Sequence, residues 1–208
     1  MYIFKFFLFL VFCSISLNAS EKGIDPYGAW IGNDIDTEHC YDVYLSEGLV
    51  RFFKNEKSKR VVDFGCGLGD YVRAFRDNGI AAEGYDGHPD TYTLSGGIAH
   101  QINLALPFDL RTRFDWVLSL EVGEHIPAEF ERNYIENLVR HAEKGIVLSW
   151  AVPGQPGYGH VNNHENEYIK EVMKKYGFFS DEVSASVLRS SVCAWWFKNT
   201  IMVFPRET

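Results

Sequence analysis

The chain has 208 residues, of which 46% are apolar and 23% charged, which is enough material for one globular domain with a substantial core. Acidic residues outnumber basic ones by 28 to 20, and a net charge of −8 repels phosphate backbones. This balance disfavours general nucleic-acid binding. Ordinary glycine and proline contents, with no low-complexity tract or repeat, exclude disordered, solenoid and collagen-like chains.

The first 19 residues have the composition of a secretory signal peptide. They contain one basic residue, Lys5, no acidic residue and a long apolar run, and they end in the small residue Ala19. We expect cleavage before Ser20, which leaves residues 20–208 as one domain in the secretory pathway or outside the cell, with no membrane span. An uncleaved anchor is the alternative, although the apolar run is shorter than the roughly 20 residues that a spanning helix needs.

Cysteine usage does not predict a disulfide framework. Cleavage would remove Cys13 and leave an odd, sparse set: Cys40, Cys66 and Cys193. Cys66 lies inside a glycine turn, where we expect a small buried residue. Only a Cys40–Cys193 pairing is then open, and the sequence does not establish its geometry.

Helices and strands are expected to alternate along residues 36–208. Helical spacing of apolar residues predicts a first helix between Asp36 and Lys57, capped by Asp36 or Thr37. Further helices are expected at 70–78, at 128–144 after Pro127, and at 163–178; strands are expected at 61–64, 80–86, 99–104, 114–121 and 145–152. Segments 183–189 and 195–204 are expected to form a terminal antiparallel hairpin. The order predicts one α/β domain with a mostly parallel sheet.

A glycine turn follows the first of these strands, which carries Asp63. Its three glycines have the spacing G-x-G-x-G: Gly65, Gly67 and Gly69. A dinucleotide fingerprint has Gly or Ala one position later, where this chain has Asp70, and a carboxylate there would repel a pyrophosphate. Asp86 ends the next strand, where a carboxylate can accept hydrogen bonds from both ribose hydroxyls. The pattern points to a nucleoside without phosphates.

These residues resemble motif I and the following acidic strand end of class I S-adenosylmethionine-dependent methyltransferases. The resemblance extends over residues 61–204 and implies a Rossmann-like fold and S-adenosylmethionine as cofactor. It implies that Asp63 and the turn of Gly65, Cys66, Gly67 and Gly69 hold the methionine end, that Asp86 holds the ribose, and that Asn103 lies near the adenine amine. We also place Glu121 at this cofactor site. The alternative is a tight turn whose acids cap helices.

The acceptor of such a methyl group would lie beyond the strands 114–121 and 145–152. An Asp/Asn-Pro-Pro-Tyr run, which is usual in family members that methylate base or glutamine nitrogens, is absent after residue 120. The sequence has Glu121, Glu124 and His125 instead, which would face the same way on a helical turn. The absence of the Asp/Asn-Pro-Pro-Tyr run disfavours N-methylation of bases or glutamine.

The E-x-x-E-H stretch resembles the metal-binding motif of ubiquinone-biosynthesis O-methyltransferases and of small-RNA 3′-terminal 2′-O-methyltransferases. The resemblance implies that Glu121, Glu124 and His125 hold Mg²⁺ or a similar divalent ion, with His160 or His164 as a further ligand. The alternative is a metal-free site in which the Glu and His orient the loop. His125 or His160 would then act as the general base on an acceptor hydroxyl.

Residues 150–165 contain prolines, glycines, histidines and asparagines, and loops with such side chains often bind a ligand. Asn162 or Asn163 could instead cap the following helix. Trp150, Trp195 and Trp196 could stack on an aromatic acceptor or pack in the core.

Together these patterns predict a signal-bearing, single-domain S-adenosylmethionine-dependent methyltransferase that acts on an oxygen of a small molecule. His125 and His160 are the candidate catalytic residues, with a divalent metal as an option. Two alternatives remain open. An uncovered cleft would suit a methyltransferase of protein side chains or termini, and an unused acceptor loop would suit a catalytically silent cofactor-binding module.

Overall fold

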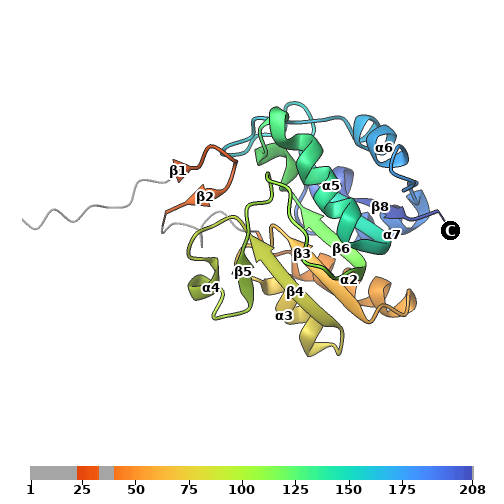
Figure 1. Ribbon diagram of the computed structural model, residues 1–208. Coiled ribbons are helices and arrows are strands. Elements are labelled where there is room, and N and C mark those ends of the chain that lie inside the picture. The colour runs from red at the N-terminus through yellow and green to blue at the C-terminus, as the bar shows by residue number, and fades with distance from the viewer. Residues whose placement is uncertain (1–22, 33–39, 208) are drawn as a thin grey trace, which may run out of the picture.

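The computed structural model describes residues 23–32 and 40–207 and contains a six-stranded sheet with the order β5-β4-β3-β6-β7-β8 (Figure 1). The expected leader, residues 1–19, lies outside the described residues. Within the described ranges, no helix combines the length and the hydrophobicity needed to cross a bilayer.

Five neighbouring strands of the sheet run parallel: β3 (Arg60–Phe64), β4 (Ala81–Asp86), β5 (Ala99–Gln101), β6 (Phe114–Leu120) and β7 (Ala142–Ser149). The last strand, β8 (Met202–Pro205), is antiparallel to β7. The expected α/β class, with its mostly parallel sheet and C-terminal antiparallel pairing, is confirmed.

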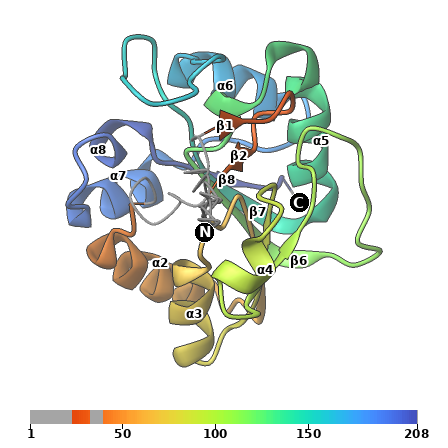
Figure 2. The ribbon, with the colours of Figure 1, turned by 90° about the vertical axis from the view of Figure 1, so that its left-hand side faces the viewer.

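Helices cover both faces of the sheet (Figures 1 and 2). One face packs against α2 (Val43–Asn55), α3 (Asp70–Asp77), α7 (Glu182–Ser191) and α8 (Phe197–Thr200). The other face packs against α5 (Glu131–His141) and α6 (Asn166–Lys174). Neighbouring residues Val61 and Val62 are both fully buried, one in each core, because side chains alternate across a strand. Each such side chain contributes roughly 1.5–3 kcal/mol to folding.

Two helix ends differ from the prediction. Asp42, and neither Asp36 nor Thr37, caps α2: its Oδ1 accepts hydrogen bonds from the Tyr44 and Leu45 amides. Asp36 and Thr37 lie outside the described residues. Helix α5 ends at His141 rather than at residue 144, because residues 142–149 form β7.

The segment 183–189 forms helix α7, so its assignment to a strand was wrong. Its V-x-A-x-V alternation imitates the two-residue period of a strand. Asp181 caps the helix by accepting from the amides of Val183 and Ser184, and the helical turn buries Ala185 and Leu188. The partner of β8 is therefore β7, and residues 197–200 of the second expected strand form α8.

A two-stranded hairpin of β1 (Gly23–Ile24) and β2 (Trp30–Ile31) lies beyond the carboxyl ends of the main strands (Figure 2). Gly28, at φ +93°, packs so closely that a Cβ there would lie 2.1 Å from the His125 carbonyl oxygen. Ala29 packs against Gly87, and His88 Nε2 lies 2.9 Å from the Gly32 carbonyl oxygen. The hairpin thus contacts the loops after both β4 and β6.

Candidate functional site

A cavity of about 430 Å³ opens at the carboxyl edge of the sheet. Its walls include the turn after β3, the end of β4, the hairpin, the loops after β6 and β7, and residues 195–197. Most of the predicted site residues line it: Asp63, Gly65, Cys66, Asp86, Asn103, Glu121, His125 and His160. Gly67, Gly69 and Glu124 do not line the cavity.

The glycine turn is shaped by left-handed backbone and by Asp86. Gly65 has φ +85°, and a Cβ there would lie 2.2 Å from Val122 Cγ2. The amide of Gly67 donates to Asp86 Oδ2 at 2.8 Å, and the amide of His88 donates to Oδ1 at 2.9 Å. Each carboxylate oxygen has a second lone pair, so Asp86 can also accept from ribose hydroxyls.

Asp63 is a buried acid at the floor of the cavity. Burial, together with the charge of Asp86, raises the pKa of Asp63 to about 8. Asp63 is therefore largely neutral at pH 7, and a cation bound next to it would favour the carboxylate.

Asn103 is an uncharged side chain in the cavity wall, unlike the acids Asp63 and Asp86. Its Oδ1 accepts a hydrogen bond from the Ala105 amide at 2.9 Å. The oxygen keeps a second lone pair, so Asn103 can accept from a ligand through Oδ1 as well as donate to it through Nδ2. Asn103 can therefore meet either an adenine ring nitrogen or the exocyclic amine.

The described cysteines, Cys40, Cys66 and Cys193, are free thiols. Cys66 is buried in the turn as expected, and burial raises the pKa of its thiol. Asp42, which caps α2, also accepts from the Cys193 amide through Oδ2 at 2.6 Å. This hydrogen bond holds the segment before α8 against the start of α2.

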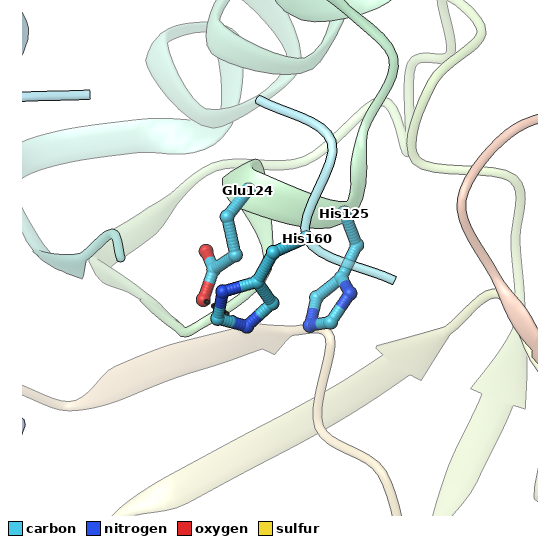
Figure 3. A group of neighbouring side chains, drawn as sticks. All are labelled: Glu124, His125 and His160. Carbon is cyan, nitrogen blue, oxygen red and sulfur yellow. Dashed lines mark ion pairs between the residues drawn. The ribbon is translucent and has the colours of Figure 1, made fainter. Parts of the chain in front are cut away.

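Glu124, His125 and His160 converge beside the cavity (Figure 3). Glu124 and His125 belong to the short helix η1 (Gly123–His125), and His160 comes from the loop after β7. Each residue offers one ligand atom, and these atoms lie within 4.8 Å of one another. The structure therefore brings three of the expected metal ligands together.

Glu121 lies next to this cluster but uses its carboxylate elsewhere. Its Oε2 accepts from Gln155 Nε2 at 2.6 Å, and its Oε1 accepts from the Thr200 hydroxyl at 3.2 Å. Its backbone, at φ +52°, is left-handed, so the chain turns sharply as β6 ends. Glu121 thus has two donors of its own, and its charge also helps to raise the pKa of the neighbouring Glu124.

Both histidines of the cluster have a fixed orientation. His160 Nδ1 lies 3.2 Å from the Gln155 carbonyl oxygen, and His125 Nδ1 lies 3.2 Å from that of Gly159. A carbonyl only accepts, so in the neutral rings Nδ1 carries the proton and Nε2 is the basic nitrogen. His160 Nε2 lies 3.9 Å from Glu124 Oε1. Metal-ligating histidines typically have their second nitrogen held in this way.

Glu124 is completely buried, and neither of its carboxyl oxygens has a hydrogen-bond partner among the described residues. Burial, followed by the charge of Glu121, raises its pKa well above the usual range. A buried acid without donors is costly to the fold. A cation between Glu124 and the two imidazoles would remove that cost.

His164, the other histidine that we considered as a ligand, belongs to a separate cluster. Its Nε2 lies 2.6 Å from Glu131 Oε2, and Glu131 also accepts from Asn162 and from the Tyr168 hydroxyl. Burial would raise the pKa of Glu131, but these hydrogen bonds outweigh it and lower the pKa. The cluster fixes the end of the loop that carries His160.

Helix α6 begins after Glu165, so neither Asn162 nor Asn163 caps it. Asn162 donates to Glu131, whereas Asn163 donates to the carbonyl oxygens of Val152 and Gln155. Both asparagines therefore organise the loop after β7.

The tryptophans divide between the core and the cavity. Trp150 is fully buried, and its Nε1 donates to the Asn162 carbonyl oxygen at 2.6 Å. Trp195 and Trp196 line the cavity, where Trp195 is 54% exposed. Trp30 of the hairpin, which the sequence analysis did not consider, meets the His125 ring edge-on with 5.4 Å between ring centroids.

Comparison with known proteins identifies the fold and the family. Residues 38–154 match the methyltransferase domain family. The probable chloroplastic tocopherol O-methyltransferase of Oryza sativa subsp. japonica is 33% identical over 119 residues, and the match covers 46% of this chain and 30% of that protein. The chain thus spans about a third of the length of this curated relative.

Two solved structures share the fold at low sequence identity. Magnesium protoporphyrin IX methyltransferase from Synechocystis PCC 6803, with bound S-adenosylhomocysteine, is 18% identical over 78% of this chain and 82% of that chain, with a TM-score of 0.60. A sugar N-methyltransferase from Streptoalloteichus is 14% identical over 80% and 88% of the two chains, with a TM-score of 0.63. Both alignments extend well beyond the residues that match the family.

Proposed function

This chain belongs to the class I S-adenosylmethionine-dependent methyltransferases, and on that premise we propose that it transfers a methyl group to a hydroxyl oxygen of a small molecule with the help of a divalent metal ion. The observation that carries the metal-assisted part is the buried carboxyl of Glu124, which has no hydrogen-bond partner in the described part of the chain and lies beside two oriented imidazoles. The residues that line the cavity support the proposal that S-adenosylmethionine binds there.

The cofactor would occupy the half of the cavity next to β3 and β4. Asp86 would accept from the ribose hydroxyls, Asn103 would hydrogen-bond to the adenine, and Asp63 would face the charged methionine end. The positive charge of the cofactor would favour loss of the Asp63 proton, and the resulting carboxylate would pair with that charge.

The residues of the cluster fit a divalent cation. Glu124 would supply a carboxylate oxygen, and His125 and His160 would each supply Nε2. A bound cation there would lower the pKa of an acceptor hydroxyl and align its oxygen with the methyl group. Without a cation, Nε2 of either histidine would accept the hydroxyl proton itself, which is the second candidate mechanism.

The size and walls of the cavity favour a small acceptor. A volume of about 430 Å³ has to hold both the cofactor and the acceptor. The hairpin residues Tyr27 and Trp30 and the helix-end residues Trp195 and Trp196 enclose it with aromatic surface. Such walls suit a compact, flat molecule better than a polymer.

The test is incubation with methyl-labelled S-adenosylmethionine and metabolite extracts, followed by mass spectrometry of each labelled product. We expect label in an O-methyl group, and we expect chelation to abolish turnover while leaving cofactor binding nearly intact. Turnover that survives exhaustive chelation but is lost in His125→Ala or His160→Ala would support the histidine base. Label on protein would favour a protein methyltransferase, and no transfer would favour a silent binding module.

Substitution of Asp86 tests the cofactor site. Asp86→Ala should weaken binding of S-adenosylmethionine at least tenfold, because hydrogen bonds to a charged acceptor contribute roughly 1.5–3 kcal/mol. Isothermal titration calorimetry measures the loss, and Asp90→Ala, an exposed acid in the same loop, is the matched control. Unchanged affinity in Asp86→Ala would rule out this ribose site.

A further inference from the structure

Gln155 connects the carboxylate of Glu121 to His160. Gln155 is 9% exposed and lines the cavity. Its Nε2 donates to Glu121 Oε2 at 2.6 Å, and its backbone carbonyl faces His160 Nδ1 at 3.2 Å. Its Oε1 is buried and has no hydrogen-bond partner among the described residues.

The orientation of the Gln155 amide follows from its neighbour. A carboxylate only accepts hydrogen bonds, so the amide nitrogen has to face Glu121. The opposite orientation would place two oxygens 2.6 Å apart with no proton between them. Glu121 therefore directs the Gln155 oxygen away from itself.

Two residues that contact His160 thus carry buried side-chain oxygens without a hydrogen-bond partner among the described residues. His160 is linked to Gln155 through Nδ1, and its Nε2 lies 3.9 Å from Glu124 Oε1. The unpartnered atoms are Gln155 Oε1 and both carboxyl oxygens of Glu124. Glu121, by contrast, has a donor on each of its oxygens. Burying an oxygen without a hydrogen-bond donor costs free energy, and a bound cation offsets that cost. Amide oxygens are common ligands of hard cations.

We propose that Gln155 Oε1 is the fourth ligand of the cation site formed by Glu124, His125 and His160, and that Glu121 orients Gln155 instead of binding the ion. This assignment rests on the proposed function and revises the ligand set that the motif implied. Two imidazole nitrogens, one carboxylate oxygen and one amide oxygen carry a single negative charge. Such a mixed set favours Mn²⁺ or Fe²⁺ over Mg²⁺, which prefers oxygen ligands alone.

The test is titration of the metal-free full chain with Mn²⁺, followed by calorimetry and by electron paramagnetic resonance of free Mn²⁺. Gln155→Met removes the oxygen at similar side-chain length and should weaken Mn²⁺ binding at least tenfold. Gln155→Glu returns an oxygen to that position but loses the donor to Glu121, so it should bind Mn²⁺ more tightly than Gln155→Met and less tightly than wild type. Glu121→Gln no longer forces the Gln155 nitrogen toward residue 121, so it should weaken Mn²⁺ binding, but less than Glu124→Gln does. Gln101→Met, an exposed position on β5, is the matched control.

The titrations distinguish failure of the Gln155 assignment from failure of the proposed metal-assisted function. If Gln155→Met binds Mn²⁺ as tightly as wild type does, the Gln155 assignment alone is overturned. The same holds if Glu121→Gln loses as much Mn²⁺ affinity as Glu124→Gln. Wild-type protein that binds no Mn²⁺ would overturn both the assignment and the metal part of the proposed function. Cofactor affinity and thermal unfolding of each variant show that a loss of Mn²⁺ binding is not a loss of the fold.

Discussion

Replacing Glu124 by methionine should make the metal-free protein more stable and at the same time abolish its metal binding. The side chain is fully buried, and its two oxygens lack partners among the described residues. Methionine has a similar length and no unsatisfied oxygen, so the free energy of unfolding should rise by roughly 1–3 kcal/mol. The same change removes the only charged ligand of the proposed site, and Mn²⁺ affinity should fall at least a hundredfold.

Thermal unfolding in chelator and Mn²⁺ titration measure the two effects on the same preparations. Glu129→Met, at an exposed position five residues along the chain, should alter neither. A Glu124→Met variant that is less stable than wild type in chelator would show that Glu124 serves the fold rather than a ligand.

Binding of S-adenosylmethionine should release close to one proton near pH 7, and Asp63→Asn should abolish that release. The pKa of Asp63 is raised to about 8, so the ligand-free protein holds the proton below that pH. The positive charges of the cofactor favour the carboxylate, and affinity should therefore rise with pH, by up to about tenfold per unit between pH 6 and pH 8, and then level off.

The raised pKa of Asp63 also determines how the stability of the fold changes with pH. An unfolded chain releases this proton near pH 4, so the contribution of Asp63 to stability is lost as pH rises from about 4 to about 8. Calorimetry in buffers of different ionisation enthalpy measures the proton release, and Asp77→Asn, an exposed acid at the end of α3, is the control. Equal release from wild type and Asp63→Asn would assign the proton to another group.

Local sequence patterns predicted the strand, the helix and the following strand that carry the proposed cofactor residues. The strand, the glycine turn and the helix that follow one another from residue 60 to residue 77 depend on neighbouring residues, and Asp86 ends the next strand. Because parallel strands end at the same edge, their order in the chain is enough to bring Asp63 and Asp86 together.

The acceptor half could be predicted only in part, because it depends on contacts between distant segments. The motif gave Glu121 and Glu124 equal roles as metal ligands, but Gln155 and Thr200 donate to Glu121, whereas the carboxyl oxygens of Glu124 have no hydrogen-bond partner among the described residues. Glutamine does not titrate, so a search for charged or metal-ligating residues passes over it. The hairpin was missed for a similar reason, since its contacts with residues after β4 and β6 are visible only in the folded chain.

The family match and the cavity walls do not cover the same residues. The match ends at residue 154, and it begins after the hairpin. Yet the cavity is also lined by Tyr27–Trp30, by Gln155–Tyr158 and His160, and by Trp195–Phe197, all of which lie outside the match. Two relatives could therefore keep the cofactor half identical and diverge in the molecule they methylate, through changes in three short peripheral segments. Alignments restricted to residues 38–154 would group such enzymes together, whereas comparison of these segments would separate them by acceptor.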